Sequence, residues 1–236
     1  MAFLTEPRSQ PAIRAPAVVW LLIALIVGLE IGREYVWPGS SDAIMLRYGL
    51  VPAHFSPAWA ALHPAEAGSW FDRALSLVTF NLLHGSFLHV GVNALWLLAF
   101  GSVVARRLGT PLFLIFFVLC GIAAAALHLA LNWGSLNPVI GASGAISGLM
   151  AAGIRMADFR GAAIDQDVEV LRPLTDRMVL SFTMVWTIAN IAAGLTNLGV
   201  EAGQTIAWQA HIGGYFAGLL LATPFDAIAR RRPLKV

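Results

Sequence analysis

The chain has 236 residues, of which 58% are hydrophobic and only 12% are charged, and its mean hydropathy is +0.74. The charged fraction is about half that of an ordinary soluble domain, so the composition excludes a soluble globular enzyme, a disordered segment and a disulfide scaffold. The net charge of +2 comes from small basic clusters between apolar runs. Because no aromatic residues interleave with these clusters, we expect no nucleic-acid partner. The single cysteine, Cys120, is expected to face lipid or to pack in the core.

Long apolar stretches predict several membrane-spanning helices, each of which needs roughly 20 mostly apolar residues. Six stretches meet or nearly meet this length, namely residues 15–32, about 83–105, 111–131, about 139–154, 179–198 and about 204–225. The fourth stretch is short and rich in glycine, and turn-forming residues separate it from the third. The sequence therefore predicts an all-α membrane protein, with a six-helix bundle that forms a single domain over residues 1–236.

The basic residues predict which side of the membrane each connection faces. If the amino terminus lies inside, only Arg33, Arg47 and Arg73 lie outside. The inner side then holds the other twelve: Arg8, Arg14, Arg106, Arg107, Arg155, Arg160, Arg172, Arg177, Arg230, Arg231, Arg232 and Lys235. We therefore expect a multi-pass protein with an uncleaved first span and short cytoplasmic tails, at about residues 1–14 and 227–236. The excess of arginine over lysine and the abundant alanine favour a bacterial inner (cytoplasmic) membrane.

The connection between the first two predicted spans, residues 36–80, is the one long outer segment. A structureless loop of that length is improbable, so we expect this segment to be ordered. Its aromatic residues suit an element that lies at the membrane interface or dips into it. These aromatic residues are Trp37, Phe55, Trp59, Trp70 and Phe71.

Polar residues within membrane spans are costly and are therefore candidates for function. They gather in the second, fourth and sixth predicted spans, as His84, His89 and Asn93, then Gly141, Ser143 and Gly144, then His211, Gly214 and Gly218. Ser143 lies five residues past Pro138 and His211 seven past Gln204, which is about 7 Å and 10 Å along their helices. His89 and Asn93, at i and i+4, share one helix face. We expect all four polar side chains at one level in the outer half of the membrane.

This arrangement predicts a serine nucleophile with a histidine base. The pairs Gly144/Gly148 and Gly214/Gly218 have the spacing that lets helix backbones nearly touch, which would bring Ser143 within hydrogen-bond reach of His211. A serine at a helix start also has free backbone N–H groups that would stabilise an oxyanion. His89 and Asn93 would add side-chain donors. Because the predicted spans contain no aspartate, we expect a dyad without a third, histidine-orienting acid.

Other interpretations of single polar residues are less specific. A Gly-x-Ser-Gly motif in a membrane helix, taken alone, is more often a packing feature, and a lone histidine there more often makes an interhelical hydrogen bond or a proton relay. We interpret His128 as structural, His54 and His63 as solvated surface, and Asn190 and Asn197 as adhesive. A metal site is disfavoured, because no carboxylate or cysteine accompanies the membrane histidines. We therefore expect no metal and no cofactor.

Three motifs in this order resemble the rhomboid intramembrane serine proteases. They are His84-x4-His89-x3-Asn93, Gly141-x-Ser143-Gly144 and Ala210-His211-x2-Gly214-x3-Gly218, on alternate helices of a six-span chain. The resemblance covers about residues 70–225. It implies a rhomboid-like bundle with a partly membrane-embedded outer loop between helices 1 and 2, and an endopeptidase that cuts transmembrane substrates near the outer face of the bilayer.

The resemblance also implies roles for single residues. Ser143 is the nucleophile, His211 the general base and acid, and His89, Asn93 and the Ser143 N–H form the oxyanion hole. His84, Gly141, Gly144, Gly214 and Gly218 support the site, while the fifth helix and residues 199–203 form a lateral substrate gate.

The chain departs from the family pattern at two places. Trp70 and Arg73 stand three residues apart, where the family often has an adjacent pair, and Ser147 occupies a position where the family commonly has an aromatic residue on the catalytic histidine.

Two other functions remain open at this stage. A noncatalytic rhomboid-like protein would bind transmembrane clients, but such proteins typically lose the serine or the histidine, and this chain keeps both. A transporter or proton-linked channel would need polar residues through the full membrane depth. The inner halves of the second, fourth and sixth spans are almost wholly apolar, as in residues 97–100 and 219–222, which favours a site open to one side only.

Overall fold

The computed structural model describes residues 15–158, 166–167, 170–196 and 205–231. The first half of the chain forms α1 (Ala17–Ile31), η1 (Gly32–Val36), η2 (Pro38–Ser40), α2 (Ser41–Tyr48), η3 (Pro52–Phe55), α3 (Pro57–Leu62), α4 (Pro64–Ala67), α5 (Trp70–Thr79) and η4 (Phe80–Leu82). The second half forms α6 (Phe87–Trp96), η5 (Leu97–Gly101), α7 (Ser102–Leu108), α8 (Thr110–Leu131), α9 (Ser143–Met156), α10 (Arg177–Thr196) and α11 (Trp208–Arg230). A two-residue antiparallel pair, β1 (Ala157–Asp158) and β2 (Gln166–Asp167), follows α9.

Four helices of the described part are long and apolar enough to cross a membrane. They are the continuous helix Phe87–Leu108, which comprises α6, η5 and α7, together with α8, α10 and α11. This architecture is that of an all-α membrane protein. Helices α1 and α9 have 15 and 14 residues, fewer than the roughly 20 that span a bilayer without tilt or thinning. The six-span count therefore stays a prediction.

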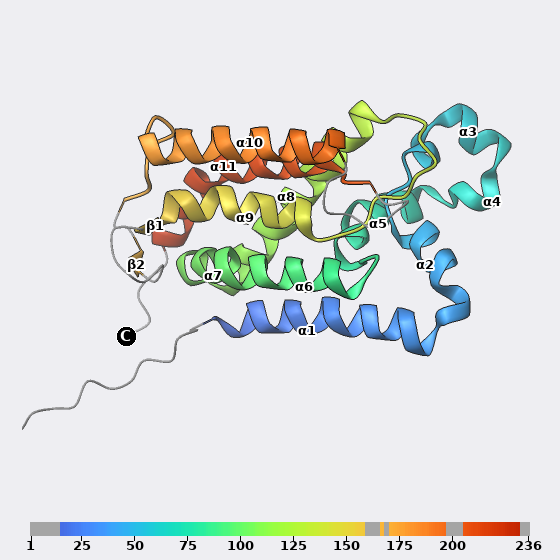
Figure 1. Cartoon of the computed structure of the whole chain (residues 1–236), viewed down its shortest axis with the longest axis horizontal. Helices are drawn as coiled ribbons and strands as arrows, with labels where there is room; N and C mark the ends of the chain where they lie inside the picture. Colours follow the sequence, from blue (N-terminus) through green and yellow to red (C-terminus); the bar gives the residue numbers. More distant parts are fainter. Residues whose placement is uncertain (1–14, 159–165, 168–169, 197–204, 232–236) are drawn as a thin grey trace, which may run out of the picture.

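The starts of α6, α9 and α11 lie at the same end of the bundle. In Figure 1 these helices run in the same direction, with α1 and α10 alongside them and α8 crossing behind. The predicted outer segment folds into α2 to α5 at that end, so the expectation that it is ordered is confirmed. Three helices with a shared direction bring their first residues close together, as the candidate site requires.

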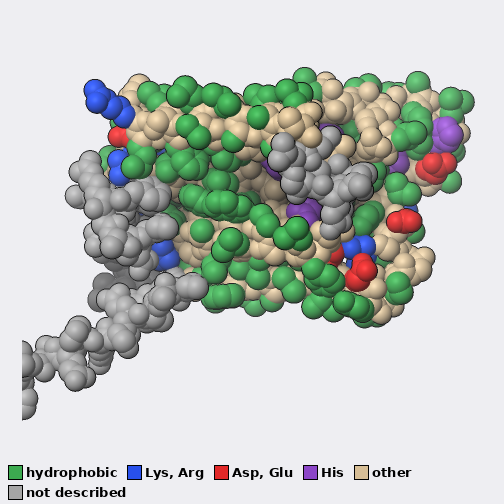
Figure 2. Space-filling model, in the orientation of Figure 1, with side chains coloured by type: hydrophobic (Ala, Val, Ile, Leu, Met, Phe, Trp, Pro, Cys, Tyr) green, Lys and Arg blue, Asp and Glu red, His purple; other side chains and the backbone are tan. Residues whose placement is uncertain are grey.

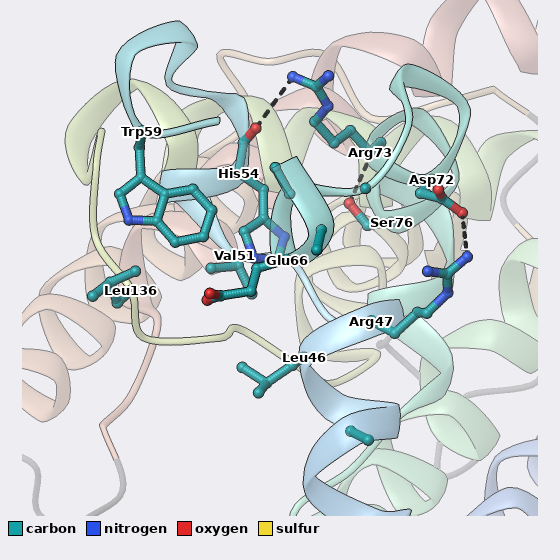
Figure 3. A pocket seen from close by; sticks show the side chains of 14 residues that line it. Leu46, Arg47, Val51, His54, Trp59, Glu66, Asp72, Arg73, Ser76 and Leu136 are labelled. Carbon is teal, nitrogen blue, oxygen red and sulfur yellow. Dashed lines mark hydrogen bonds and ion pairs between the residues drawn. The ribbon is translucent and has the colours of Figure 1, made fainter. Parts of the chain in front are cut away.

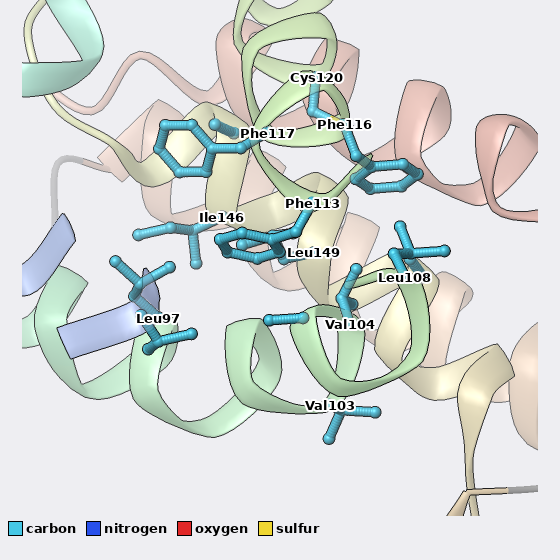
Figure 4. Packing of buried hydrophobic residues seen from close by; sticks show 14 of the residues in the cluster. Leu97, Val103, Val104, Leu108, Phe113, Phe116, Phe117, Cys120, Ile146 and Leu149 are labelled. Carbon is cyan, nitrogen blue, oxygen red and sulfur yellow. The ribbon is translucent and has the colours of Figure 1, made fainter. Parts of the chain in front are cut away.

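Helix α9 is the centre of the bundle. Every residue of α9 after Ser143 is buried, and the helix packs against α8, α11 and η5. Figure 4 shows the core on one of its sides, where Ile146 and Leu149 meet Phe113 of α8 and Leu97 of η5. A helix that is apolar or small on all faces is expected to be surrounded in this way.

The predicted close approach of two helices is confirmed at the contact of α9 with α11. A Cβ atom added at Gly214 would overlap the carbonyl oxygen of Gly144, and one added at Gly218 would overlap that of Gly148. Gly148 also lies against Cys120, which is fully buried in the core rather than facing lipid. Only residues without side chains allow backbones this close, and the first contact lies one residue after Ser143.

Three predicted helix starts are wrong by about four residues. Helix α6 begins at Phe87 rather than near residue 83, because the Ser86 hydroxyl accepts a hydrogen bond from the His89 N–H (3.2 Å) and caps the helix. Helix α9 begins at Ser143 rather than at residue 139, because residues 139–141 run extended. There Val139 exchanges two backbone hydrogen bonds with Leu50, and the Gly141 N–H donates to the Phe80 carbonyl (2.8 Å).

Helix α11 begins at Trp208, not near residue 204. The distances of 7 and 10 Å along the helices are therefore also wrong. Ser143 is the first residue of α9 and His211 the fourth of α11, so both lie in a first helical turn.

We expect Gly214→Ala to destabilise the bundle, because its Cβ would press on the Gly144 carbonyl where α9 and α11 touch. Overpacking of this kind costs typically about 1–3 kcal/mol. The measurement is thermal unfolding of the purified protein in detergent. Gly28→Ala in α1 is the matched control, because nothing lies within 4 Å of its added Cβ. Equal unfolding temperatures for the two variants would contradict the close contact.

Candidate active site

The side chains of Ser143 and His211 are in hydrogen-bond contact. The Oγ atom of Ser143 lies 2.8 Å from Nε2 of His211, and both residues are half-buried. The predicted proximity of these two groups is confirmed. The geometry places a hydroxyl group against an imidazole nitrogen that can take its proton.

The other nitrogen of the same imidazole is bonded to a third helix. Nδ1 of His211 lies 2.8 Å from Oδ1 of Asn190 on α10. The sequence prediction treated Asn190 as adhesive rather than catalytic and expected no histidine-orienting acid. Asn190 is a neutral amide, and its contact with His211 was not predicted. A signal was present in the sequence, since Thr183, Trp186 and Asn190 follow the i, i+3, i+7 spacing of one helix face.

His89 lies beside Ser143, against the backbone of Gly141. A Cβ atom on Gly141 would lie 2.8 Å from His89 Nε2 and 3.6 Å from Ser143 Oγ, and Gly141 has φ of +124°. Both the backbone conformation and the space therefore require glycine. The extended segment that ends at Gly141 thus places the His89 ring next to the serine.

Two further predicted site residues are Asn93, on α6, and His84, which precedes α6. Asn93 is one turn after His89, so the two side chains share a helix face. The Asn93 amide nitrogen is buried and makes no hydrogen bond with the part of the chain that the structure describes. The buried ring of His84 meets that of His89 edge-on, with centroids 5.0 Å apart. The structure therefore assembles the polar residues of all three motifs at one end of the bundle.

Ser147 and Tyr215 lie one turn after Ser143 and His211. The Ser147 hydroxyl donates to the Ser143 carbonyl (2.7 Å). Tyr215, one turn after His211, is buried and stacks on Trp186 of α10 with centroids 4.2 Å apart. Its hydroxyl is hydrogen-bonded to Thr183 (2.9 Å). Aromatic packing thus holds α10 against α11 one turn away from the histidine.

The separated residues Trp70 and Arg73 also meet. On α5 their i, i+3 spacing places the Arg73 guanidinium over the Trp70 ring, 5.6 Å from its centroid.

The predicted gate residues 199–203, and Asn197, lie outside the described residues.

In the view of Figure 2, histidine side chains show in a depression on one face of the bundle.

A cavity of about 280 Å³ lies within the α2–α5 segment (Figure 3). Its polar lining includes Arg47, His54, Glu66, Asp72 and Arg73. Hydrogen bonds from Ser69, and then the ion pair with Arg47 (2.8 Å), lower the pKa of Asp72. His54 was expected to be solvated surface. It is instead half-buried and stacked on Trp59, with centroids 5.2 Å apart.

The fold and the Ser143–His211 contact define a multi-pass helical membrane protein with a candidate serine nucleophile. Residues 72–226 match the Rhomboid domain family. The chain is also 30% identical over 169 residues to the rhomboid protease GlpG of Pectobacterium atrosepticum. That alignment covers 70% of this chain and 52% of the relative, so the chain spans about half the length of that protein. The chain belongs to the rhomboid family.

We expect His54 to make the protein less stable as the pH falls. Burial lowers the pKa of His54 below its usual 6.5, with a smaller opposing effect of Glu66. The unfolded chain therefore binds the proton more readily, and stability falls as the pH drops below about 6.5. Thermal unfolding of wild type and His54→Gln between pH 7.0 and 5.5 measures this. The His54→Gln variant should lose less stability over that range, and parallel losses would contradict the assignment.

Proposed function

We propose that the protein is an intramembrane serine endopeptidase that cleaves transmembrane protein substrates near the outer face of the bilayer. The observation that carries this proposal is the 2.8 Å contact between Ser143 Oγ and His211 Nε2. Membership of the rhomboid family and the likeness to a protein named a rhomboid protease support it. A protein that only binds transmembrane clients has no need of a serine and a histidine in this contact.

The reaction proceeds through an acyl-enzyme. Ser143 Oγ attacks the carbonyl carbon of the scissile peptide bond while its proton passes to Nε2 of His211. The tetrahedral intermediate collapses as the imidazolium gives that proton to the leaving amine, and the C–N bond breaks. His211 then takes a proton from a water molecule, whose oxygen attacks the acyl ester. His211 then returns this proton to the serine oxygen, which regenerates the Ser143 hydroxyl and releases the new carboxyl terminus.

Three donors surround the position of the oxyanion in this proposal. The Ser143 N–H lies at a helix start, where backbone donors have no intrahelical acceptor. The His89 ring lies next to Ser143 across Gly141. The Asn93 amide nitrogen is buried without a partner among the described residues, which is costly in a resting protein. Its role as a donor to the oxyanion accounts for that cost.

In this proposal, the other predicted site residues allow helices and side chains to pack closely around Ser143 and His211. Gly144, Gly214 and Gly218 let α11 approach α9 closely enough for His211 to reach Ser143. Gly141 leaves room for the His89 ring, and His84 packs against the other side of that ring. The proposed chemistry needs no metal or other cofactor.

The membrane topology is part of the proposal. We place both termini in the cytoplasm, because twelve basic residues then lie inside and three outside. The spans are α1, the helix Phe87–Leu108, α8, α9, α10 and α11, in a single domain within a bacterial inner membrane. Ser143 then lies beneath the outer surface, and α2 to α5 form an outer loop that dips into the interface. Helix α10 borders the lateral entry for a substrate helix.

Labelling of Ser143 by a fluorophosphonate tests the nucleophile. We expect the purified wild type to be labelled and to cleave a transmembrane reporter in proteoliposomes, with both signals lost in Ser143→Ala and in His211→Ala. Ser147→Ala is the matched control, because Ser147 lies one turn later on α9 and bonds only to the Ser143 carbonyl among the described contacts. Undiminished labelling of Ser143→Ala would overturn the proposed function.

Removal of the Asn93 amide tests the oxyanion donors. We expect Asn93→Ala to lower kcat for the reporter by about 10²-fold with little change in KM, because the donor acts on charge that develops in the transition state. Asn81→Ala is the control, because it removes another buried amide. Asn81 lies in η4, and its amide donates to the Val78 carbonyl of α5. Equal losses in the two variants would show that only packing is affected.

A further inference from the structure

We propose that Asn190 of α10 is a positioning residue for His211, which sets the tautomer that activates Ser143. The inference rests on the proposed function of Ser143 and His211. Asn190, His211 and Ser143 form a series of hydrogen bonds across three helices, with 2.8 Å from Asn190 Oδ1 to His211 Nδ1 and 2.8 Å from His211 Nε2 to Ser143 Oγ.

The orientation of the Asn190 amide follows from its second contact. Its Nδ2 lies 2.9 Å from the carbonyl oxygen of Trp186, one turn earlier on α10. A carbonyl oxygen only accepts hydrogen bonds, so the amide nitrogen must face it. The amide oxygen is therefore the atom that faces His211.

The orientation of the amide determines the state of the imidazole. An amide oxygen only accepts, so Nδ1 of His211 carries the hydrogen and donates to Asn190. In the neutral ring Nε2 then has a free lone pair, and it accepts the Ser143 hydroxyl hydrogen. This is the arrangement in which the histidine can act as a base.

The Trp186 carbonyl also determines which end of the Asn190 amide faces the histidine. An asparagine that turned its NH2 group to the histidine would require the opposite tautomer, with the hydrogen on Nε2. In the Ser-His-Asp template, replacing the aspartate by asparagine has that effect and lowers kcat about 10⁴-fold. Here the hydrogen bond to Trp186 opposes the turn. A neutral amide also avoids the cost of a carboxylate within the bilayer.

The position of Asn190 on α10 makes this control depend on the packing of that helix. Val179 is the one residue of α10 that is fully buried. The helix is held to α11 by the stacking of Trp186 on Tyr215 and the hydrogen bond between the Thr183 and Tyr215 hydroxyls. Movement of α10 away from α11 would separate Asn190 from His211. The reactivity of Ser143 is therefore coupled to the position of α10.

The rate of fluorophosphonate labelling tests the proposal, because it reports serine reactivity without a substrate helix. We expect Asn190→Leu, which keeps the volume but lacks the acceptor, to label about 10- to 100-fold more slowly and to lower kcat for the reporter with KM unchanged. Ser181→Ala is the matched control, because it removes a side-chain hydrogen bond of the same helix, to the Met178 carbonyl, that does not hold α10 to α11. It should label within about twofold of wild type, a difference under 0.5 kcal/mol.

A carboxylate at this position gives a second readout. We expect Asn190→Asp to label faster than Asn190→Leu and to move the acid limb of its pH–rate profile to higher pH, because a carboxylate favours the protonated imidazole. A purely structural role would not move that profile. This readout also decides the question if Asn190→Leu fails to fold, as judged by thermal unfolding.

Three results would overturn the positioning role. They are wild-type labelling of Asn190→Leu, an equal loss in Ser181→Ala, and an unmoved pH profile in Asn190→Asp. If wild type itself is not labelled, the proposed function fails and this inference fails with it. Labelled wild type with unchanged Asn190→Leu overturns this inference alone.

Discussion

The candidate site depends on a direct backbone contact between α9 and α11. Gly144 and Gly148 of α9 lie against Gly214 and Gly218 of α11 so closely that no side chain fits between them. Lipid tails are as apolar as a leucine side chain, so close packing rather than the hydrophobic effect must hold such helices together. The same contact brings His211 to Ser143. Stability and chemistry therefore rely on the same glycines, which leaves little freedom for substitution there.

Helices α9 and α10 differ in how much of their surface is packed against the bundle. Helix α9 is buried along its whole length after Ser143, and it holds the serine in a rigid frame. Helix α10 is mostly exposed and is held to α11 by an aromatic stack and a few hydrogen bonds. A weakly packed helix is easily displaced. In the proposed function such a helix borders the opening for a substrate and, through Asn190, links that opening to the state of His211.

The start of α9 was predicted four residues too early for a physical reason. Val139 and Ile140 are apolar, but apolar composition does not distinguish a helix from a non-helical segment. The Leu50–Val139 backbone pairing and the bond from Gly141 to Phe80 keep residues 139–141 extended. Their partners lie more than 50 residues away in the sequence, so no local pattern could reveal them. The consequence is functional, since Ser143 becomes the first residue of its helix.

Spacing along the sequence alone determined the apolar stretches, the polar residues within them and the two glycine pairs. These features follow from the length of a bilayer span and from the helical repeat, which are local properties of a chain. Only the tertiary structure decided which residue faces Nδ1 of His211. The spacing of Thr183, Trp186 and Asn190 places them on one face of α10, but it does not say which helix that face meets, and a hydrogen bond between distant helices depends on that.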